Sequence, residues 1–224
     1  MRLITILLLA AATLPAQTTT RTVRAFGQGS VTIGPDQLKI TFGVVTQAAT
    51  AQDAGSQNAS ISTTMQTALR KVLGNTGDIA TISYNITANY TYPAGRPAQL
   101  TGYTATNSVE ATSSNTALAG LLIDAATAAG ANSIGALRFS LKDNSIQYAQ
   151  ALTAATQQAR THANAIAAGL GAQVGRVITA QEGSVSTPIP LNRLGAVDAT
   201  AVPTPIDTGT LTVTATVTVD FELN

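Results

Sequence analysis

Alternation of apolar and polar residues predicts strands along much of the chain. Between residues 38 and 44, and again between 210 and 223, apolar or alanine side chains occupy every second position. A period of two places one set of side chains against a core and the other toward solvent, as in a half-buried strand. Residues 82–92 show the same period, so Ile82, Tyr84 and Tyr90 are expected on a buried face. Further strands are expected at 23–33, 99–111, 135–141 and 175–181.

Three other segments repeat apolar residues every three or four positions, which is the spacing of an amphipathic helix. They cover residues 51–72, 118–129 and 148–170. Asn115 precedes the second segment as a candidate N-cap, and Gly169 and Gly171 end the third, because glycine readily terminates a helix. The apolar stripe of the third segment is expected to contain Tyr148, Leu152, Ala155, Ala159, Ile166 and Leu170.

The order of these elements predicts an α+β fold. Residues 36–92 and 99–141 each read strand, helix, strand, and together they form the split βαββαβ arrangement of ferredoxin-like units. We therefore expect a mixed or antiparallel sheet with amphipathic helices packed on it, plus an extra helix and C-terminal strands. Pro35 and Asp36 suit a hairpin turn between the first two strands.

Residues 1–16 have the features of a secretory signal peptide. Arg2 precedes a run of about ten apolar residues, and small residues follow at Ala12 and Ala16, either of which suits cleavage. A run this short does not span a bilayer, and no later stretch reaches the roughly 20 apolar residues of a membrane helix. Residues 17–224 are then the mature domain, expected in the periplasm or secreted, with no transmembrane segment. The alternative is that the apolar run forms a short buried strand or helix.

Residues 184–209 show no period and are expected to form a long loop before the last strand. They contain Pro188, Pro190, Pro203 and Pro205. A loop of this length in a compact domain usually has a function or is mobile. Two interpretations stay open: an arm that contacts a neighbouring subunit, and a disordered excursion.

Composition and charge narrow the possible functions. Charged residues make up 10% of the chain and the formal net charge is +1, whereas an ordinary soluble domain has about 25% charged residues. Because phosphate binding needs clustered Lys and Arg, no nucleic-acid partner is expected. The chain has no Cys, which excludes disulfides, thiolate metal sites and cysteine nucleophiles. A weakly charged surface also lowers the desolvation cost of docking one face against another.

Few residues suit catalysis. His162 is the one histidine, so no His-rich metal site can form, and its place at the edge of the third helix stripe favours packing over catalysis. Gly27-Gln28-Gly29 starts like a dinucleotide-binding loop, but no third glycine or helix follows, which favours a flexible or bulged strand. The carboxylates are scattered, so a hydrolase would require a polar pocket that joins two of them. No catalytic residue, cofactor or metal is therefore expected.

Four tyrosines form a candidate ligand platform: Tyr84, Tyr90, Tyr92 and Tyr103, on two strands expected to be adjacent. Stacked aromatic rings can hold a base or a sugar ring. Without a flanking basic patch, cross-strand packing of the rings is the simpler interpretation.

Short segments along the whole chain resemble the SIMPL domain family. In the first half they are Gly27-Gln28-Gly29, Pro35-Asp36, the helical segment 51–73 and Asp78-Ile79-Ala80-Thr81. In the second half, Gly102-Tyr103-Thr104-Ala105-Thr106-Asn107 is similar to the family's Gly-Tyr-x-Ala-x-Asn strand, and Ile123-Asp124-Ala125-Ala126, Gly130-Ala131-Asn132 and Phe139-Ser140-Leu141 follow in the family's order. The similarity runs from about Val23 to the final strand.

The resemblance implies an exported or periplasmic α/β protein, from a family whose members tend to self-assemble and have been linked to stress tolerance, oxidative stress included. It supplies no catalytic residues. We therefore expect a non-enzymatic homo-oligomer that acts in the envelope or oxidative stress response. The alternative is a periplasmic module that binds a small ligand on the tyrosine-bearing strands.

Overall fold

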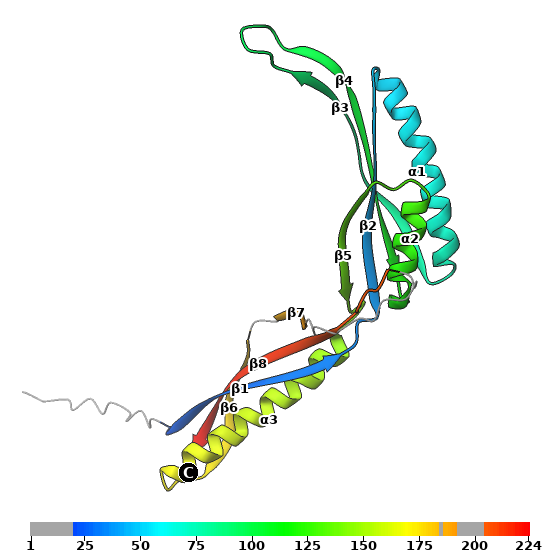
Figure 1. Cartoon of the computed structure of the whole chain (residues 1–224). Helices are drawn as coiled ribbons and strands as arrows, with labels where there is room; N and C mark the ends of the chain where they lie inside the picture. The colour runs from blue at the N-terminus through cyan, green and yellow to red at the C-terminus, as the bar shows by residue number, and fades with distance from the viewer. Residues whose placement is uncertain (1–19, 184–185, 192–203) are drawn as a thin grey trace, which may run out of the picture.

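Two units, each a sheet with helices on one face, make up the computed structural model, which describes residues 20–183, 186–191 and 204–224 (Figure 1). The expected signal peptide, residues 1–16, lies outside the described residues. The inserted unit contains β2 (Gln37–Ala48), α1 (Ala51–Leu73), β3 (Gly77–Thr91), β4 (Gln99–Ser113), η1 (Thr116–Leu118), α2 (Ala119–Ala128) and β5 (Ser133–Ser140). The terminal unit contains β1 (Thr22–Ile33), α3 (Ser145–Gly169), β6 (Val174–Glu182), β7 (Ser186–Leu191) and β8 (Thr210–Leu223).

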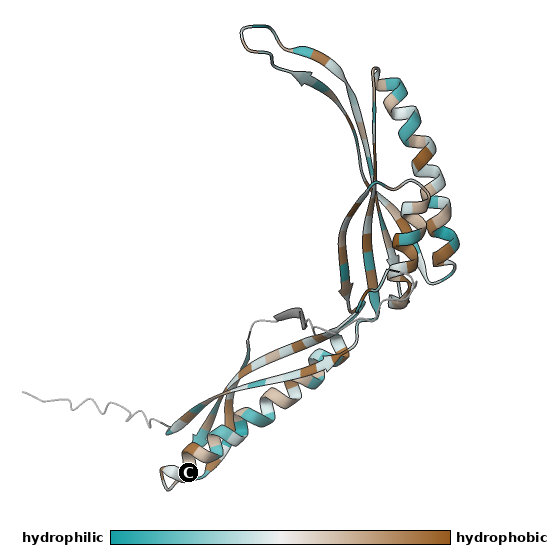
Figure 2. Ribbon diagram, viewed as in Figure 1, coloured by the Kyte–Doolittle hydropathy of each residue, from teal (hydrophilic) through white to brown (hydrophobic). Residues whose placement is uncertain are grey.

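The inserted unit confirms the expected α+β class and the split βαββαβ arrangement. Its strands are antiparallel, in the order β3-β4-β2-β5. α1 and α2 pack on one face of this sheet, where Leu38, Ile40, Phe42 and Val44 are fully buried as expected. Figure 2 shows apolar and polar residues alternating along these strands. The period of two therefore assigned the faces of β2 correctly.

Polar side chains set the starts of α1 and η1 in the inserted unit. Thr50 precedes α1, and its hydroxyl oxygen accepts a hydrogen bond from the Asp53 backbone N–H at 3.1 Å. Asn115 accepts from the Ala117 backbone N–H at 3.1 Å. Both contacts satisfy N–H groups that the first turn of a helix leaves free. Asn115 is thus the expected N-cap, although it caps η1, which leads directly into α2.

The hairpin expected at Pro35 and Asp36 is wrong, because β1 and β2 belong to different sheets. β1 instead pairs along its whole length with β8 at the other end of the chain. Asp36 lies where the chain passes between the units: its backbone N–H donates to the Ser140 carbonyl at 3.2 Å, and its Oδ1 accepts from the Lys142 backbone N–H at 2.7 Å. These contacts tie the start of β2 to the end of β5.

Part of the loop expected at 184–209 is a strand. β7 pairs antiparallel with β8 next to the stretch that pairs with β6. Residues 184–185 and 192–203 lie outside the described residues. After them, the Thr204 hydroxyl donates to Asp124 Oδ1 of α2 at 2.7 Å, and Ile206 packs against the core of the inserted unit. The chain therefore contacts the inserted unit before it enters the last strand.

α3 lies very close to β1 because small residues face one another across the contact. A Cβ placed on Gly27 would lie 2.0 Å from the Ala155 carbonyl oxygen, and one on Gly29 would lie 2.1 Å from the Ala151 carbonyl oxygen. β1 pairs with β8 in unbroken register through both glycines. The bulged strand expected at Gly27-Gln28-Gly29 is therefore wrong, and the glycines serve close packing.

The buried stripe of α3 differs in part from the expected one. Ala155 and Ala159 are buried as expected, but Ile166 and Leu170 are 44% and 69% exposed. Larger side chains cannot occupy the stripe because the backbone of β1 lies directly against it. The buried positions recur every four residues and are all alanine: Ala151, Ala155, Ala159, Ala163 and Ala167.

An ion pair across the β1–β8 ladder makes the stability of the terminal unit depend on pH. Arg24 Nε donates to Asp220 Oδ1 at 2.7 Å, and the Thr179 hydroxyl donates to Oδ2 at 2.7 Å. The Arg24 hydrogen bond, followed by that of Thr179, lowers the pKa of Asp220 to about 2. A carboxyl with a depressed folded-state pKa stabilises the fold above its unfolded pKa of about 3.9 and loses that contribution as pH falls toward 2.

We therefore expect Arg24→Gln to flatten the fall of the melting temperature between about pH 4 and pH 2. The variant should melt below the wild type at pH 6 and approach it at pH 2, because the pair contributes nothing once Asp220 is protonated. Circular dichroism melting curves at half-unit pH intervals measure this. Parallel curves for the two proteins across the whole range would contradict the assignment.

Candidate functional site

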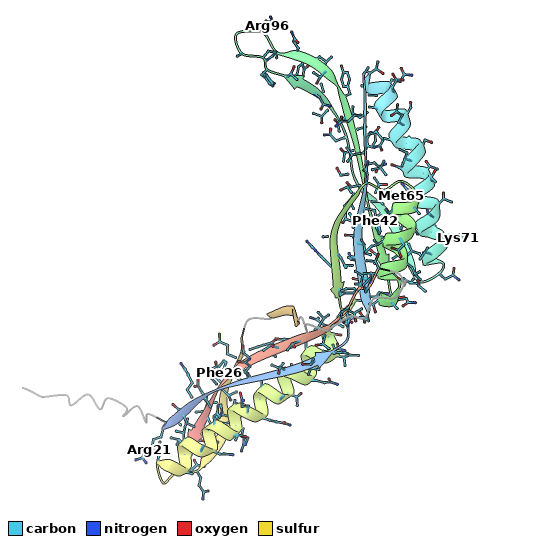
Figure 3. All side chains as sticks on the ribbon, in the orientation of Figure 1. Arg21, Phe26, Phe42, Met65, Lys71 and Arg96 are labelled. Atoms are coloured by element: carbon cyan, nitrogen blue, oxygen red, sulfur yellow. The ribbon has the colours of Figure 1, made fainter. Side chains whose placement is uncertain are left out.

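The β3–β4 hairpin extends past the start of α1 and forms a hairpin arm, defined here as residues 88–103 (Figures 1 and 3). Arg96 lies at its tip. Gly102 lies where the arm passes the turn between β2 and α1: its φ is +142°, and a Cβ there would lie 2.8 Å from the Ala48 carbonyl oxygen. Only glycine accepts both this backbone conformation and this close approach.

Two register shifts bend the hairpin. The pairing of β3 with β4 shifts at residues 81–83 and again after Asn89. Each shift is a β-bulge, which bends the pair and increases its twist. Side chains hold the second bulge: Asn89 Nδ2 donates to Thr104 Oγ1 at 2.7 Å, and the Thr101 hydroxyl donates to the Asn89 carbonyl at 3.0 Å.

The large apolar side chains of β3 are mostly exposed, and the buried face expected for this strand is wrong. Ile82, Tyr84 and Tyr90 have 53%, 55% and 50% of their surface exposed. β3 is the edge strand of its sheet, and α1 covers it only in part. A Cβ placed on Gly55 of α1 would lie 3.2 Å from Ile86 Cδ1 and 3.3 Å from Tyr84 Oη. Figure 1 shows the rest of the strand extending past the helix.

Three of the four candidate tyrosines, Tyr84, Tyr90 and Tyr103, lie on the paired strands β3 and β4, as expected. The four tyrosines are spread along the hairpin. The Tyr84 hydroxyl points toward α1, and Tyr103 lies on the opposite strand. Tyr90 is paired with Leu100 beyond the second register shift, and Tyr92 follows the end of β3 and is 79% exposed. At about 3.3 Å per residue, Tyr84 and Tyr92 are separated by roughly 26 Å of extended chain. A ligand the size of one base or sugar would contact only some of them.

The outer side of β3 lacks most features that protect natural edge strands. Among the described strands, β3 pairs with β4 alone, so its other side presents backbone N–H and C=O groups. No charged residue occurs from Ile79 to Gly95. Edge strands commonly carry Lys or Pro, or lie under another element, because a bare edge pairs with other chains. The protective features of this stretch are the two register shifts, at residues 81–83 and after Asn89, and Pro93 just beyond the end of β3.

By contrast, β1, the edge strand of the terminal sheet, is protected by α3. Gln158 Oε1 accepts a hydrogen bond from the Gln28 backbone N–H at 2.7 Å, and His162 Nδ1 donates to the Phe26 carbonyl at 2.8 Å. Both backbone groups point away from β8. His162 is exposed, and its side chain satisfies a backbone carbonyl at the edge of β1. Its place beside the apolar stripe did not predict this role.

Removing these two side chains should expose the edge of β1 while the fold survives. Gln158→Ala with His162→Ala is expected to lower the free energy of unfolding by about 1–2 kcal/mol, because each hydrogen bond contributes about 1 kcal/mol. It should also increase association of the protein, measured by light scattering at matched concentrations. Gln157→Ala with Thr161→Ala removes neighbouring exposed side chains and serves as the control. Equal association of the two variants would contradict a protective role.

A polar pocket of about 410 Å³ joins two carboxylates at the end of the inserted sheet where the chain arrives from β1. Asp36, Asp78 and Lys142 line it, together with hydroxyl and amide side chains. Asp36 already accepts the Lys142 backbone N–H, and both carboxylates are exposed. The acid of a glycosidase works from a desolvated position. The arrangement therefore favours a loop held by Asp36 over a hydrolytic site.

A comparison with known families covers both units in one match. The family model named SIMPL, described as a protein of unknown function (DUF541), matches residues 23–221. The chain belongs to the SIMPL family. The expected resemblance is thereby confirmed from β1 to β8. The SIMPL match includes the hairpin arm and both of the edge strands compared above.

Similar proteins include the 26 kDa periplasmic immunogenic proteins of Brucella melitensis biotype 1 and of Brucella abortus strain S19. Each is 29% identical to this SIMPL chain over 201 residues, which cover 84% of the chain and 80% of the relative. Their names place those two proteins in the periplasm and state no enzymatic activity. In the described part of this chain, no helix is both long and apolar enough to cross a membrane, and no group of three or more His, Cys, Asp or Glu could hold a metal ion.

Proposed function

We propose that this SIMPL-family chain is an exported, non-enzymatic protein that self-assembles and acts through its surfaces in the envelope or oxidative stress response. The observation that carries self-assembly is the exposed apolar surface of the β3–β4 hairpin. Ile82, Tyr84, Tyr90 and Leu100 are each about half exposed. On a soluble protein, apolar surface gathered on one element marks a site of interaction.

Among the described residues, no helix covers the second face of either sheet, and these two faces support the same proposal. Helices pack on one face of each sheet, and the opposite face of β4 carries Thr104, Thr106 and Ser108. The opposite faces also carry the three described ion pairs, Arg24–Asp220, Lys39–Glu110 and Arg176–Glu222. Docking is therefore favoured at the stretches that carry Thr and Ser between these pairs, where little charge has to be desolvated.

Light scattering combined with size-exclusion chromatography tests self-assembly directly. The protein should be purified after export and measured across at least a hundredfold range of concentration. We expect a mass that is a whole multiple of the mature chain and that persists on dilution. A mass equal to one chain at every concentration would overturn self-assembly.

Export is supported by the signal-peptide pattern of residues 1–16 and by the periplasmic names of the two relatives. Mass spectrometry of the protein isolated from cell fractions tests it. The expected N-terminus follows Ala16 or Ala12, and the expected fraction is the periplasm or the medium. An uncleaved chain in the cytoplasmic fraction would overturn export.

The stress role rests on the family resemblance and needs a test in cells. A strain without the protein should survive peroxide or envelope-damaging treatment less well than its parent, and expression of the wild-type chain should restore survival. The variants designed below separate this role from assembly, because they leave the monomer intact. Equal survival of the parent and deletion strains would overturn the stress role.

A small ligand bound on the hairpin is the second candidate function, favoured by the exposed rings of Tyr84, Tyr90 and Tyr92. Native mass spectrometry of freshly purified protein should then reveal a copurifying molecule. Tyr90→Ala with Tyr103→Ala should abolish its retention. If no ligand copurifies and this variant changes only stability, the ligand function is wrong.

A further inference from the structure

We propose that β3 of one copy pairs antiparallel with β3 of a second copy, so that two four-stranded inserted sheets become one continuous sheet of eight strands. The inference rests on the proposed self-assembly and names the edge that carries it. β3 has 15 residues, and its outer side is unpaired among the described strands. At about 3.3 Å per residue this edge spans roughly 50 Å.

Backbone groups alone supply a substantial contact along this edge. From residue 83 to Thr91, β3 has no extra residue that would interrupt its outer side. Antiparallel pairing forms on average one N–H···O=C bond for each pair of opposed residues. Pairing over this stretch thus forms roughly nine hydrogen bonds, close to the number in a typical stable interface.

The charge distribution identifies a second copy as the partner. In a two-fold contact between identical strands, residue i lies opposite residue j and j lies opposite i, so a charged residue near the two-fold axis faces its own copy and repels it. β3 carries no charge from Ile79 to Thr91. Of the other described edge strands, β1, β5 and β6 carry Arg24, Arg138 and Arg176. The uncharged β7 contains Pro188 and Pro190, which lack the backbone N–H that strand pairing needs. Among the described edges, β3 is therefore the one suited to self-pairing.

Side chains on β3 gain cover from the same contact. Ile82 and Tyr84 are 53% and 55% exposed in the single chain. Aromatic and β-branched residues that face each other across antiparallel strands stabilise the pair. The terminal unit shows the alternative arrangement, since Gln158 and His162 occupy the edge of β1 and prevent pairing there.

The first experiment places like charges on the proposed contact. Asn85 and Thr87 are exposed and lie on one face of β3, so Asn85→Lys with Thr87→Lys should leave the monomer folded. We expect the mass of the assembled species to fall by half or more. Thr153→Lys with Thr161→Lys adds the same charge to exposed positions of α3 and should leave the mass unchanged.

The outcomes separate this inference from the proposal on which it rests. If the wild type assembles and the β3 variant assembles to the same mass, the β3 contact is wrong and self-assembly stands. If the wild type is a monomer at all concentrations, both are wrong. Circular dichroism spectra and melting curves establish that the variant is folded before either result is read.

The second experiment uses the absence of cysteine from the chain. Single cysteines are introduced in turn at Ser83, Asn85, Thr87 and Asn89, and each assembled variant is oxidised. Because a disulfide requires Cα atoms within about 7 Å, antiparallel pairing should give a dimer at the position nearest the two-fold axis and little at its neighbours. Thr153→Cys is the control.

Non-reducing electrophoresis and mass spectrometry measure the products of this scan. A band of twice the chain mass, strongest at one position of β3 and absent from the α3 control, is the expected result. Equal cross-linking at all positions and in the control, or no cross-linking at any of them, would overturn the proposal. A cross-link to a strand of a different protein would overturn the choice of partner.

Discussion

Replacing Gly27 with valine is expected to lower the free energy of unfolding by at least about 3 kcal/mol. A Cβ at this position would lie 2.0 Å from the carbonyl oxygen of Ala155 and 2.6 Å from the backbone nitrogen of Ala159. Both neighbours are main-chain atoms of α3, so no rotation of a side chain relieves the overlap. The helix must move away from β1, and the buried alanine stripe then loses its contacts.

Urea denaturation followed by circular dichroism measures this effect, and Gly34→Ala is the matched control. A Cβ at Gly34 has no atom within 4 Å, so the control should change stability by less than about 0.5 kcal/mol. The double variant Gly27→Val with Ala155→Gly provides a stricter test. Because the overlap involves backbone atoms, removing the Ala155 methyl should not restore stability. Restoration would show that the side chain, and not the backbone, limits the approach.

The sequence predicted the elements well and the buried faces unevenly. β2 and β8 are central strands with helices beneath them, so their period of two reports burial directly. β3 shows an equally clear period, yet its apolar residues are exposed because α1 covers only part of an edge strand. A pattern along one strand contains no information about how far the neighbouring helix reaches. The error therefore fell on a strand whose Ile82, Tyr84 and Tyr90 are about half exposed.

The packing of α3 was underestimated for a related reason. The spacing of large apolar residues predicts that Ile166 and Leu170 are buried, but both lie outside the contact between α3 and β1 and are exposed. Alanine at every fourth position, together with Gly27 and Gly29 on a strand, was the available signal for close approach between a helix and a sheet. Reading the two segments together would have predicted the contact. Each segment alone is consistent with ordinary packing.

The candidate site could be predicted only in part. The tyrosines of β3 and β4 were found from the sequence, and their strands are adjacent as expected. The protective contacts of Gln158 and His162 could not be predicted, because they require knowing that β1 lies at the edge of a sheet. That position follows from the pairing of β1 with β8, two strands at opposite ends of the chain. The uncharged stretch from Ile79 to Gly95 was visible in the sequence, but its meaning depends on β3 being unpaired.

Replacing Asn58 is expected to have the second large effect, because this buried amide joins α1 to the two central strands of the inserted sheet. Its side chain is fully buried. Nδ2 donates to the Val44 carbonyl of β2 at 2.8 Å and to the Ala105 carbonyl of β4 at 3.0 Å. Asn58→Leu keeps a similar volume but leaves both acceptors without this donor. We expect a loss of about 2–4 kcal/mol in the free energy of unfolding, since each unsatisfied buried group costs about 1–3 kcal/mol.

Asn58→Asp distinguishes loss of the donor from loss of packing. The side chain keeps its shape, but an ionised carboxylate would face two carbonyl oxygens in a buried position, which raises the pKa of the new carboxyl in the folded state. A raised folded-state pKa gives stability that is present below the unfolded value of about 3.9 and is lost as pH rises. The loss of stability of Asn58→Asp relative to wild type should therefore be largest near pH 7 and shrink on acidification, while that of Asn58→Leu stays constant.

Ser62→Ala removes a donor to Asn58 Oδ1 and leaves the two carbonyl contacts in place, so its effect on the free energy of unfolding should be smaller. Equal pH profiles for the Asp and Leu variants in urea denaturation would show that packing, and not the paired hydrogen bonds, explains the burial of this amide.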